Sequence, residues 1–207
     1  PQYSISEFDN IPEQFEKNTI DFVFAGNVGA AQNLYVVLKA AKSVQEEKIN
    51  DNGKKIYFHI IGDGQELDNL KKYAHDNGIQ NVIFHGRKPS EEMPRYYTFA
   101  DAMIVTLTAN PLVSLTLPAK VQSYMAAGKP ILASANGEIA NVIKESGAGF
   151  CAHADDDSEF VDIVKLFLNN EERYNMGKNA RKYYVNNFSK EIVMDKLEKI
   201  LIKEAIY

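Results

Sequence analysis

Short apolar runs alternate along the chain with longer segments in which apolar residues recur at helical spacing. Six runs predict strands, the last being weaker than the other five. Nearly continuous apolar runs of this length indicate a parallel sheet that is covered on both faces. The six runs are residues 22–25, 56–61, 82–84, 102–107, 130–133 and 149–152.

The segments between these runs predict helices, because apolar residues recur in them every three or four positions. A strand followed by a helix, repeated five times with right-handed crossovers, predicts a Rossmann-like, doubly wound α/β domain of about six strands. From Ser158 the pattern is entirely helical, and Ser189 is placed to cap a last helix. The earlier helices are expected at 33–48, 65–77, 90–99, 118–127 and 138–146.

The first 20 residues are polar, contain Pro12, and predict a linker or arm. Residues 21–207 then form a single predicted domain, since no repeat or second boundary follows. The chain opens on proline without a methionine, which we interpret as an excised piece of a longer protein.

The amino-acid composition argues against several classes of binding partner. The 23 basic residues are outnumbered by 28 acidic ones, for a net charge of −5. No basic run forms a stripe, which argues against nucleic acid or anionic lipid as the main partner. A single cysteine, Cys151, excludes an internal disulfide and a Cys-rich zinc site. With no apolar stretch of membrane-spanning length and no signal-peptide start, we expect a protein of the cytoplasm or of the inner membrane face.

Ligands of doubly wound sheets bind at the carboxyl ends of the strands, so the loops there are the first candidates. Gly26, Asn27 and Gly29 follow the first strand, where paired glycines allow an anion to approach the backbone. The full dinucleotide fingerprint is missing, and a plain tight turn is an equal alternative. Gly62-Asp63-Gly64 follows the second strand; Asp63 could bind a metal or a ribose, but the segment favours a turn that also caps the next helix.

The third strand ends with His85 and is followed by Arg87 and Lys88. Two adjacent cations suit a phosphate, although solvated surface charge is an equal alternative. His85 is the histidine that we expect to contact a ligand, whereas His59 lies within a strand and suits the core. Of the remaining candidates, Asp155–Asp157 favours a solvated helix cap and Cys151 a buried structural thiol.

Residues 116–130 form the most informative block. Pro118 presets a helix start, and the amides of the preceding residues can face an anion, with the helix dipole behind them. Lys120 lies one turn into this helix and reaches the same space, while Gly128 ends the helix. A helix built only for packing could carry Lys120 and Ser123 on a solvated face. No residue is identified as a catalytic base, and no metal-ligand set is present.

With these motifs, the chain resembles the C-terminal, donor-binding half of a retaining glycosyltransferase of the two-Rossmann-domain (GT-B) type, in the large family 4, often called group 1. The resemblance covers about residues 20–200 and is closest to the branch of bacterial capsule and O-antigen assembly. The matching segments are 24–29, 60–64, 81–87, 97–101, 118–120, 128–130 and 155–159, together with Phe188-Ser189.

The resemblance implies a nucleotide-sugar donor, expected to be a UDP- or GDP-sugar, bound without a divalent metal or a covalent cofactor. It places Gly26 and Gly29 against the donor diphosphate, residues 83–87 at the base, and Ser123 at the ribose. Thr116 and Leu117 would give amides to phosphate or sugar, and Lys120 and Arg87 would hold the departing charge. The acceptor, a sugar or a lipid-linked one, and most catalytic groups belong to an N-terminal domain outside this chain.

Two features depart from the family pattern. Its usual pair of glutamates is replaced by Ser123 and by residues 113–115, and the cations that commonly follow the first strand are absent. Two alternatives therefore stay open: a nucleotide-binding or interaction domain without chemistry, and half of a GT-B-type nucleotide-sugar 2-epimerase or phosphorylase. Lys120 gives no sign of a Schiff-base site, because no apolar surroundings are evident around it.

Overall fold

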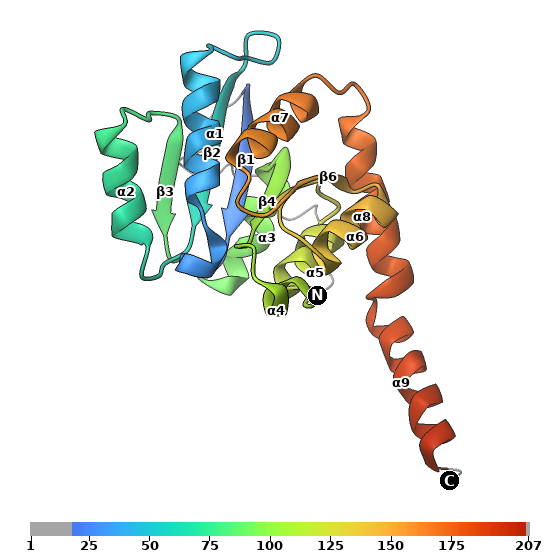
Figure 1. Cartoon of the computed structure of the whole chain (residues 1–207). Coiled ribbons are helices and arrows are strands. Elements are labelled where there is room, and N and C mark those ends of the chain that lie inside the picture. Colours follow the sequence, from blue (N-terminus) through green and yellow to red (C-terminus); the bar gives the residue numbers. More distant parts are fainter. Residues whose placement is uncertain (1–17, 206–207) are drawn as a thin grey trace.

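The computed structural model describes residues 18–205. Its centre is one sheet of six parallel strands in the order β3-β2-β1-β4-β5-β6, with helices on both faces (Figure 1). This order runs outward in both directions from β1, which confirms the predicted doubly wound fold. The strands are β1 (Thr19–Ala25), β2 (Lys55–Ile61), β3 (Val82–Gly86), β4 (Ala102–Thr106), β5 (Ile131–Ser134) and β6 (Gly149–Ala152).

Two hydrophobic cores lie on opposite faces of the sheet, because neighbouring residues of each strand point to opposite sides. In β1, Phe22 and Phe24 join the first core, whereas Val23 and Ala25 join the second. The first core is covered by α1 (Tyr35–Glu46), α2 (Leu67–Asp76) and α7 (Asp157–Leu168). The second is covered by α3 (Met93–Phe99), α5 (Ala119–Ala126), α6 (Glu138–Ser146) and α8 (Arg173–Asn187).

The element boundaries differ from the predicted ones in a few places. β1 begins at Thr19, so the strand enters the last two positions of the predicted 1–20 arm; residues 1–17 lie outside the described residues. Two short 3-10 turns, η2 (Ala30–Gln32) and η3 (Ser90–Glu92), precede α1 and α3. Pro118 is the residue before α5 and not its first helical residue.

A four-residue helix, α4 (Pro111–Ser114), lies in the segment between β4 and α5 that was not predicted to be helical. Asn110 caps it, with Oδ1 accepting hydrogen bonds from the amides of Leu112 and Val113 at 2.9 and 3.4 Å. Asn followed by Pro at the first helical position is a known start signal, but one turn is too short for a periodic pattern.

The last helix, α9 (Lys190–Ala205), projects away from the body of the domain (Figure 1). As predicted, Ser189 caps it, accepting from the amide of Ile192 at 3.5 Å. Within residues 18–205, no helix combines the length and apolar character needed to cross a membrane. The apolar side chains of α9 stay exposed, namely Val193, Met194, Leu197, Ile200, Leu201 and Ile202.

Candidate functional site

The loops that follow β1, β2 and β3 are joined at the carboxyl edge of the sheet by backbone hydrogen bonds. The amide of Gly26 donates to the carbonyl of Ile61 at 2.9 Å, and that of Gly62 to Gly86 at 2.9 Å. The amide of Val28 donates in the same way to Asp63 at 2.8 Å. The three loops therefore form one connected surface.

Two glycines make this close approach possible. Gly62 has φ +146°, and a Cβ atom on it would lie 1.8 Å from the carbonyl oxygen of Gly26. Gly64 has φ +156°, and its Cβ atom would lie 2.3 Å from the carbonyl oxygen of Val28. Both positions exclude any other residue, on backbone conformation and on space. The segment Gly62-Asp63-Gly64 thus allows close packing of the backbone and also forms the turn predicted from the sequence.

A cavity of about 820 Å³ opens over these loops. Three residues selected from the sequence line it, namely Gly26, Asn27 and Arg87. Asp63 and Lys88 line it as well; the sequence favours a turn at Asp63 and leaves Lys88 open between a phosphate contact and surface charge. Other lining residues were not predicted from the sequence. They come from η3 and the start of α3, because the chain turns back after Pro89. Those residues are Ser90, Glu91 and Met93.

Lys120 reaches the same edge from α5. Its Nζ atom lies 4.1 Å from the ring centroid of Phe24 and 2.6 Å from the position that a Cβ atom on Gly26 would take. Burial lowers the pKa of Lys120 to about 8. In the described part of the chain, no carboxylate lies within 4 Å of this ammonium group. An uncompensated, partly buried cation beside a residue that lines a cavity is a site for an anion.

Phe24 also corrects one expectation, because Lys120 does have an apolar neighbour. The adjacent Tyr124 is fully buried and fixes α5 to the end of β1. Its hydroxyl group accepts from the amide of Ala25 at 3.0 Å and donates to the carbonyl of the same residue at 2.9 Å. These two bonds hold Lys120, one turn earlier in α5, beside Gly26.

Gly29 lies next to the cavity residues, with its amide already bonded. It donates to Oε1 of Gln32 at 3.1 Å, and the Asn27 side chain donates to the same oxygen at 3.3 Å. Gln32 therefore orders the loop after β1 from within. An anion that takes the Gly29 amide would have to displace this bond.

Three predicted residues of the α4–α5 segment make local contacts. The Thr116 amide and hydroxyl group both donate to the carbonyl of Val113, at 3.1 and 2.8 Å. The Ser123 hydroxyl group donates to the carbonyl of Ala119 at 3.2 Å. Leu117 packs against the second core. The structure thus brings Lys120 against Gly26, which lines the cavity, whereas Thr116, Leu117 and Ser123, like Lys120 itself, are not among the lining residues.

The His85 side chain is buried and does not line the cavity either. The residue is 9% exposed, and its Nε2 atom lies 2.8 Å from Nδ1 of His59. The His59 Nε2 atom lies 2.8 Å from Asp21, whose carboxylate only accepts, so His59 donates there. Burial and the neighbouring His59 lower the pKa of His85 to about 4. His59 is the core residue that the sequence predicted.

Asp155 is exposed, as expected, but it does not cap α7. It has φ +62° and accepts from the Asn33 side chain at 2.6 Å and from the Ala109 amide at 2.8 Å. It therefore connects the loop after β6 to the loops after β1 and β4. Asp156 is the cap of α7, accepting from the amide of Glu159 at 2.9 Å, as predicted.

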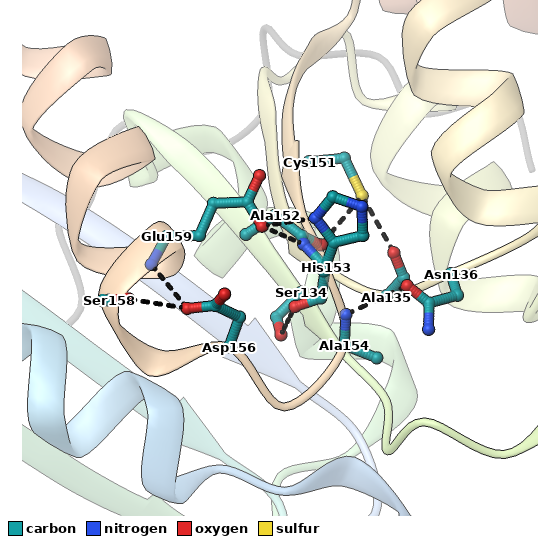
Figure 2. A network of polar contacts seen from close by, with 10 residues as sticks. All are labelled: Ser134, Ala135, Asn136, Cys151, Ala152, His153, Ala154, Asp156, Ser158 and Glu159. Atoms are coloured by element: carbon teal, nitrogen blue, oxygen red, sulfur yellow. Dashed lines mark hydrogen bonds and ion pairs between the residues drawn. The ribbon is translucent and has the colours of Figure 1, made fainter.

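The edge formed by β5 and β6 carries a polar network without a catalytic arrangement (Figure 2). The Cys151 thiol is half-buried, lies 3.3 Å from the Ala135 carbonyl, and has its pKa raised to about 11 by burial. His153 contacts Glu159 at 2.7 Å through Nδ1. A thiol with a raised pKa is a poor nucleophile, which supports the structural interpretation of Cys151. Among residues 18–205, no group of three potential metal ligands is present.

The sequence model described as "Glycosyl transferases group 1" matches residues 6–183. The chain belongs to this family. A probable glycosyltransferase of Pseudomonas aeruginosa, WbjE, is 32% identical over 195 residues, which are 91% of this chain and 45% of that protein. The lipopolysaccharide 1,2-N-acetylglucosaminetransferase of Salmonella typhimurium is 22% identical, over 95% of this chain and 52% of that protein.

Solved structures of GT-B glycosyltransferases share the fold. HepE of Anabaena, solved in complex with UDP-glucose, has a TM-score of 0.74 and 15% identity, over 90% of this chain and 49% of that chain. The present chain spans about half the length of the curated relatives it matches. The group 1 domain described above is therefore one part of the architecture of those relatives.

Proposed function

We propose that residues 21–207 form the nucleotide-sugar donor-binding domain of a retaining glycosyltransferase. In this proposal the enzyme transfers a hexose-type sugar during the synthesis of a bacterial surface polysaccharide. The observation that carries it is Lys120, a partly buried ammonium group without a carboxylate partner in the described chain, held against Gly26 at the cavity edge. A departing diphosphate is the anion that this chemistry suits.

The cavity supports the same proposal. Gly26, Arg87 and Lys88 all line the cavity, so that it carries two cations besides the backbone of the loop after β1. In this arrangement the diphosphate contacts Lys120 and the loop after β1, while the base lies toward residues 83–87. The complex of HepE with UDP-glucose favours UDP as the nucleotide of the donor. His85, Gly29, Thr116, Leu117 and Ser123 keep their predicted roles as proposals.

The proposed partner is an N-terminal acceptor domain of the same protein, and its acceptor is a sugar or lipid-linked sugar. Support comes from α9, whose exposed apolar side chains Val193, Leu197, Ile200 and Leu201 would be covered by that domain. The reaction would occur between the two domains, without a bound divalent metal, in the cytoplasm or at the inner membrane face. Alone, the 207-residue chain is expected to bind donor weakly and to transfer no sugar.

Thermal unfolding with UDP, GDP, ADP, CMP and their sugar conjugates tests donor binding. A nucleotide at 100 times its dissociation constant stabilises the fold by about 2.7 kcal/mol, which raises Tm by roughly 5–10 °C. We expect one nucleotide family to give this shift and Lys120→Ala to abolish it. Lys72→Ala, at an exposed ion pair on α2, is the matched control. A shift that Lys120→Ala retains would contradict the assignment of the diphosphate.

The retaining stereochemistry needs a separate test with this domain joined to its N-terminal half. Nuclear magnetic resonance of the first product reports the anomeric configuration. We expect the product to keep the configuration of the donor sugar, and an inverted product would contradict the proposal.

Nucleotide binding without chemistry is the second candidate function. It is favoured by Ser123, which occupies a glutamate position of the family and bonds to its own helix at Ala119. The joined protein distinguishes the two functions, because a purely binding domain would give the nucleotide shift without any sugar transfer.

A further inference from the structure

Helix α8 is a strongly basic surface on an acidic protein. Its 15 residues include the exposed cations Lys178, Arg181 and Lys182 and no aspartate or glutamate, while its fourth cation, Arg173, is buried and paired with Asp51. The whole chain carries a net charge of −5. The sequence alone showed no basic stripe, because Lys178 is separated from Arg181 and Lys182 and joins them on one face only when the helix forms.

A groove of about 560 Å³ runs along this helix, against the end of α5. Tyr174, Lys178, Arg181, Lys182 and Val185 line it, at a spacing of four, three, one and three residues, which places them on one helix face. Tyr174 is 63% exposed and Val185 is 45% exposed. The groove thus has cations at its centre and exposed apolar groups at its ends, and no carboxylate among its lining residues.

The floor of the groove is fixed by close backbone contact. A Cβ atom on Gly177 would lie 2.3 Å from the carbonyl oxygen of Gly128. The Arg181 guanidinium group donates to the Ala126 carbonyl, which holds this cation at the end of α5. Lys178 and Lys182 stay exposed, and neither forms an ion pair within residues 18–205. Their charges are available to an external anion.

We propose that this groove docks the domain onto an anionic phospholipid surface. Lys178 and Lys182 would contact headgroup phosphates, and Tyr174 and Val185 would enter the interfacial layer, where amphipathic aromatic side chains are favoured. A soluble phosphate would bind the cations but would leave the exposed tyrosine and valine without a role. This chemistry therefore favours lipid, in contrast to the expectation from net charge.

The docking surface is separate from the donor cavity. Lys120 lies at the first turn of α5, and Ala126 to Gly128 lie at its other end, about 10 Å away at 1.5 Å per residue. Lipid and nucleotide would therefore bind independently. This independence allows the docking proposal to fail or stand without affecting the proposed function.

Co-sedimentation of the 207-residue chain with vesicles tests the proposal. We expect binding to vesicles of 70% phosphatidylcholine and 30% phosphatidylglycerol that falls with added salt, and little binding to pure phosphatidylcholine. Each surface cation contributes about fivefold to such binding, so Lys178→Ala/Lys182→Ala is expected to weaken it about 25-fold. The matched control, Lys71→Ala/Lys72→Ala on exposed α2, removes the same charge and should bind like wild type.

Tyr174→Ser keeps every cation and is expected to weaken vesicle binding several-fold, which a purely electrostatic surface would not show. Equal binding to both vesicle types would overturn the proposal. So would equal weakening in the α2 control, or competition of free glycerol phosphate with the vesicles at the lysine pair. A short RNA duplex that binds the chain while anionic vesicles do not would assign the groove to nucleic acid instead.

Discussion

The loops after β1–β3 and the segment after β4 lie at the same edge of the sheet and are built differently. The first three are joined backbone to backbone, through bonds such as Gly26 to Ile61 and Gly62 to Gly86. The segment after β4 carries the one-turn helix α4, with Leu112 77% and Leu115 79% exposed. One of its attachments is a side chain, Asp155, from the loop after β6.

This difference in construction indicates that the two halves of the proposed site are ordered to different degrees before a ligand binds. The half assigned to base and diphosphate is held in place by main-chain bonds and glycine packing. The half assigned to the transferred sugar also has a main-chain bond, from the Thr108 amide to the Ala31 carbonyl, and a close glycine contact between Gly137 and Ser114. However, it presents the apolar side chains of Leu112 and Leu115 to solvent. We infer that the first half is formed before ligand binds, whereas the second is completed by the donor sugar or the acceptor domain.

The largest expected effect comes from breaking the packed half at Gly62. Gly62→Ala places a Cβ atom 1.8 Å from the Gly26 carbonyl oxygen, at a φ of +146°. We expect the free energy of unfolding to fall by about 3–5 kcal/mol, since the backbones must separate. Chemical denaturation measures this loss. Gly78→Ala is the control, since Gly78 has φ +64° and open space around it. Equal losses in the two variants would show that the close approach is not needed.

The next effect is a loss of folding stability at low pH, which we expect from His85 in strand β3. Its folded pKa of about 4 lies below the ordinary 6.5, so the unfolded chain binds more protons between these values. The stability is fully present above pH 6.5 and is lost as pH falls toward 4, by about 3 kcal/mol. His85→Gln removes this titration and should flatten the decline in unfolding free energy over that window. His75→Gln, at an exposed histidine, should keep the decline. An unchanged slope in His85→Gln would contradict the assignment.

A smaller effect is expected at Asp155, on the open half. Asp155→Asn keeps a side chain that tolerates a φ of +62° but loses the charge and one acceptor oxygen. We expect a loss of about 1 kcal/mol and faster hydrogen exchange at the Ala109 amide. Asp157→Asn, which breaks the exposed pair with Lys39, is the control and should leave that amide protected. Unchanged hydrogen exchange at the Ala109 amide in Asp155→Asn would show that the bond to Asp155 does not hold the segment after β4 in place.

The fold was predictable because strands that are buried on both faces of the sheet consist of nearly continuous apolar residues. The apolar runs at 56–61 and 102–107, for instance, match β2 and β4 to within one residue at either end. Gly26, Asn27 and Arg87 line one cavity, as expected where the ends of parallel strands meet, and their role in binding stays a prediction. The same rule selected His85, whose side chain is instead buried against His59 and does not line the cavity.

What could not be predicted depends on contacts between distant segments. Asp155 bridges Asn33 and Ala109, which are 122 and 46 residues away. The burial of Lys120 depends on Phe24, a residue of another element. Helix α4 is a single turn, too short to show a period. Each of these features needs the three-dimensional arrangement that local pattern does not contain.

The central claim is that Lys120 provides the charge that binds the donor diphosphate, and calorimetric titration with UDP and GDP at pH 7 and pH 9 tests it most directly. Because burial lowers the pKa of Lys120 to about 8, wild-type affinity should fall about tenfold between these pH values as the free ammonium group loses its proton. Lys120→Arg stays charged and should show no such fall, while Lys120→Ala should bind at least tenfold more weakly at pH 7. Wild-type affinity in Lys120→Ala, with the same pH profile, would contradict the account.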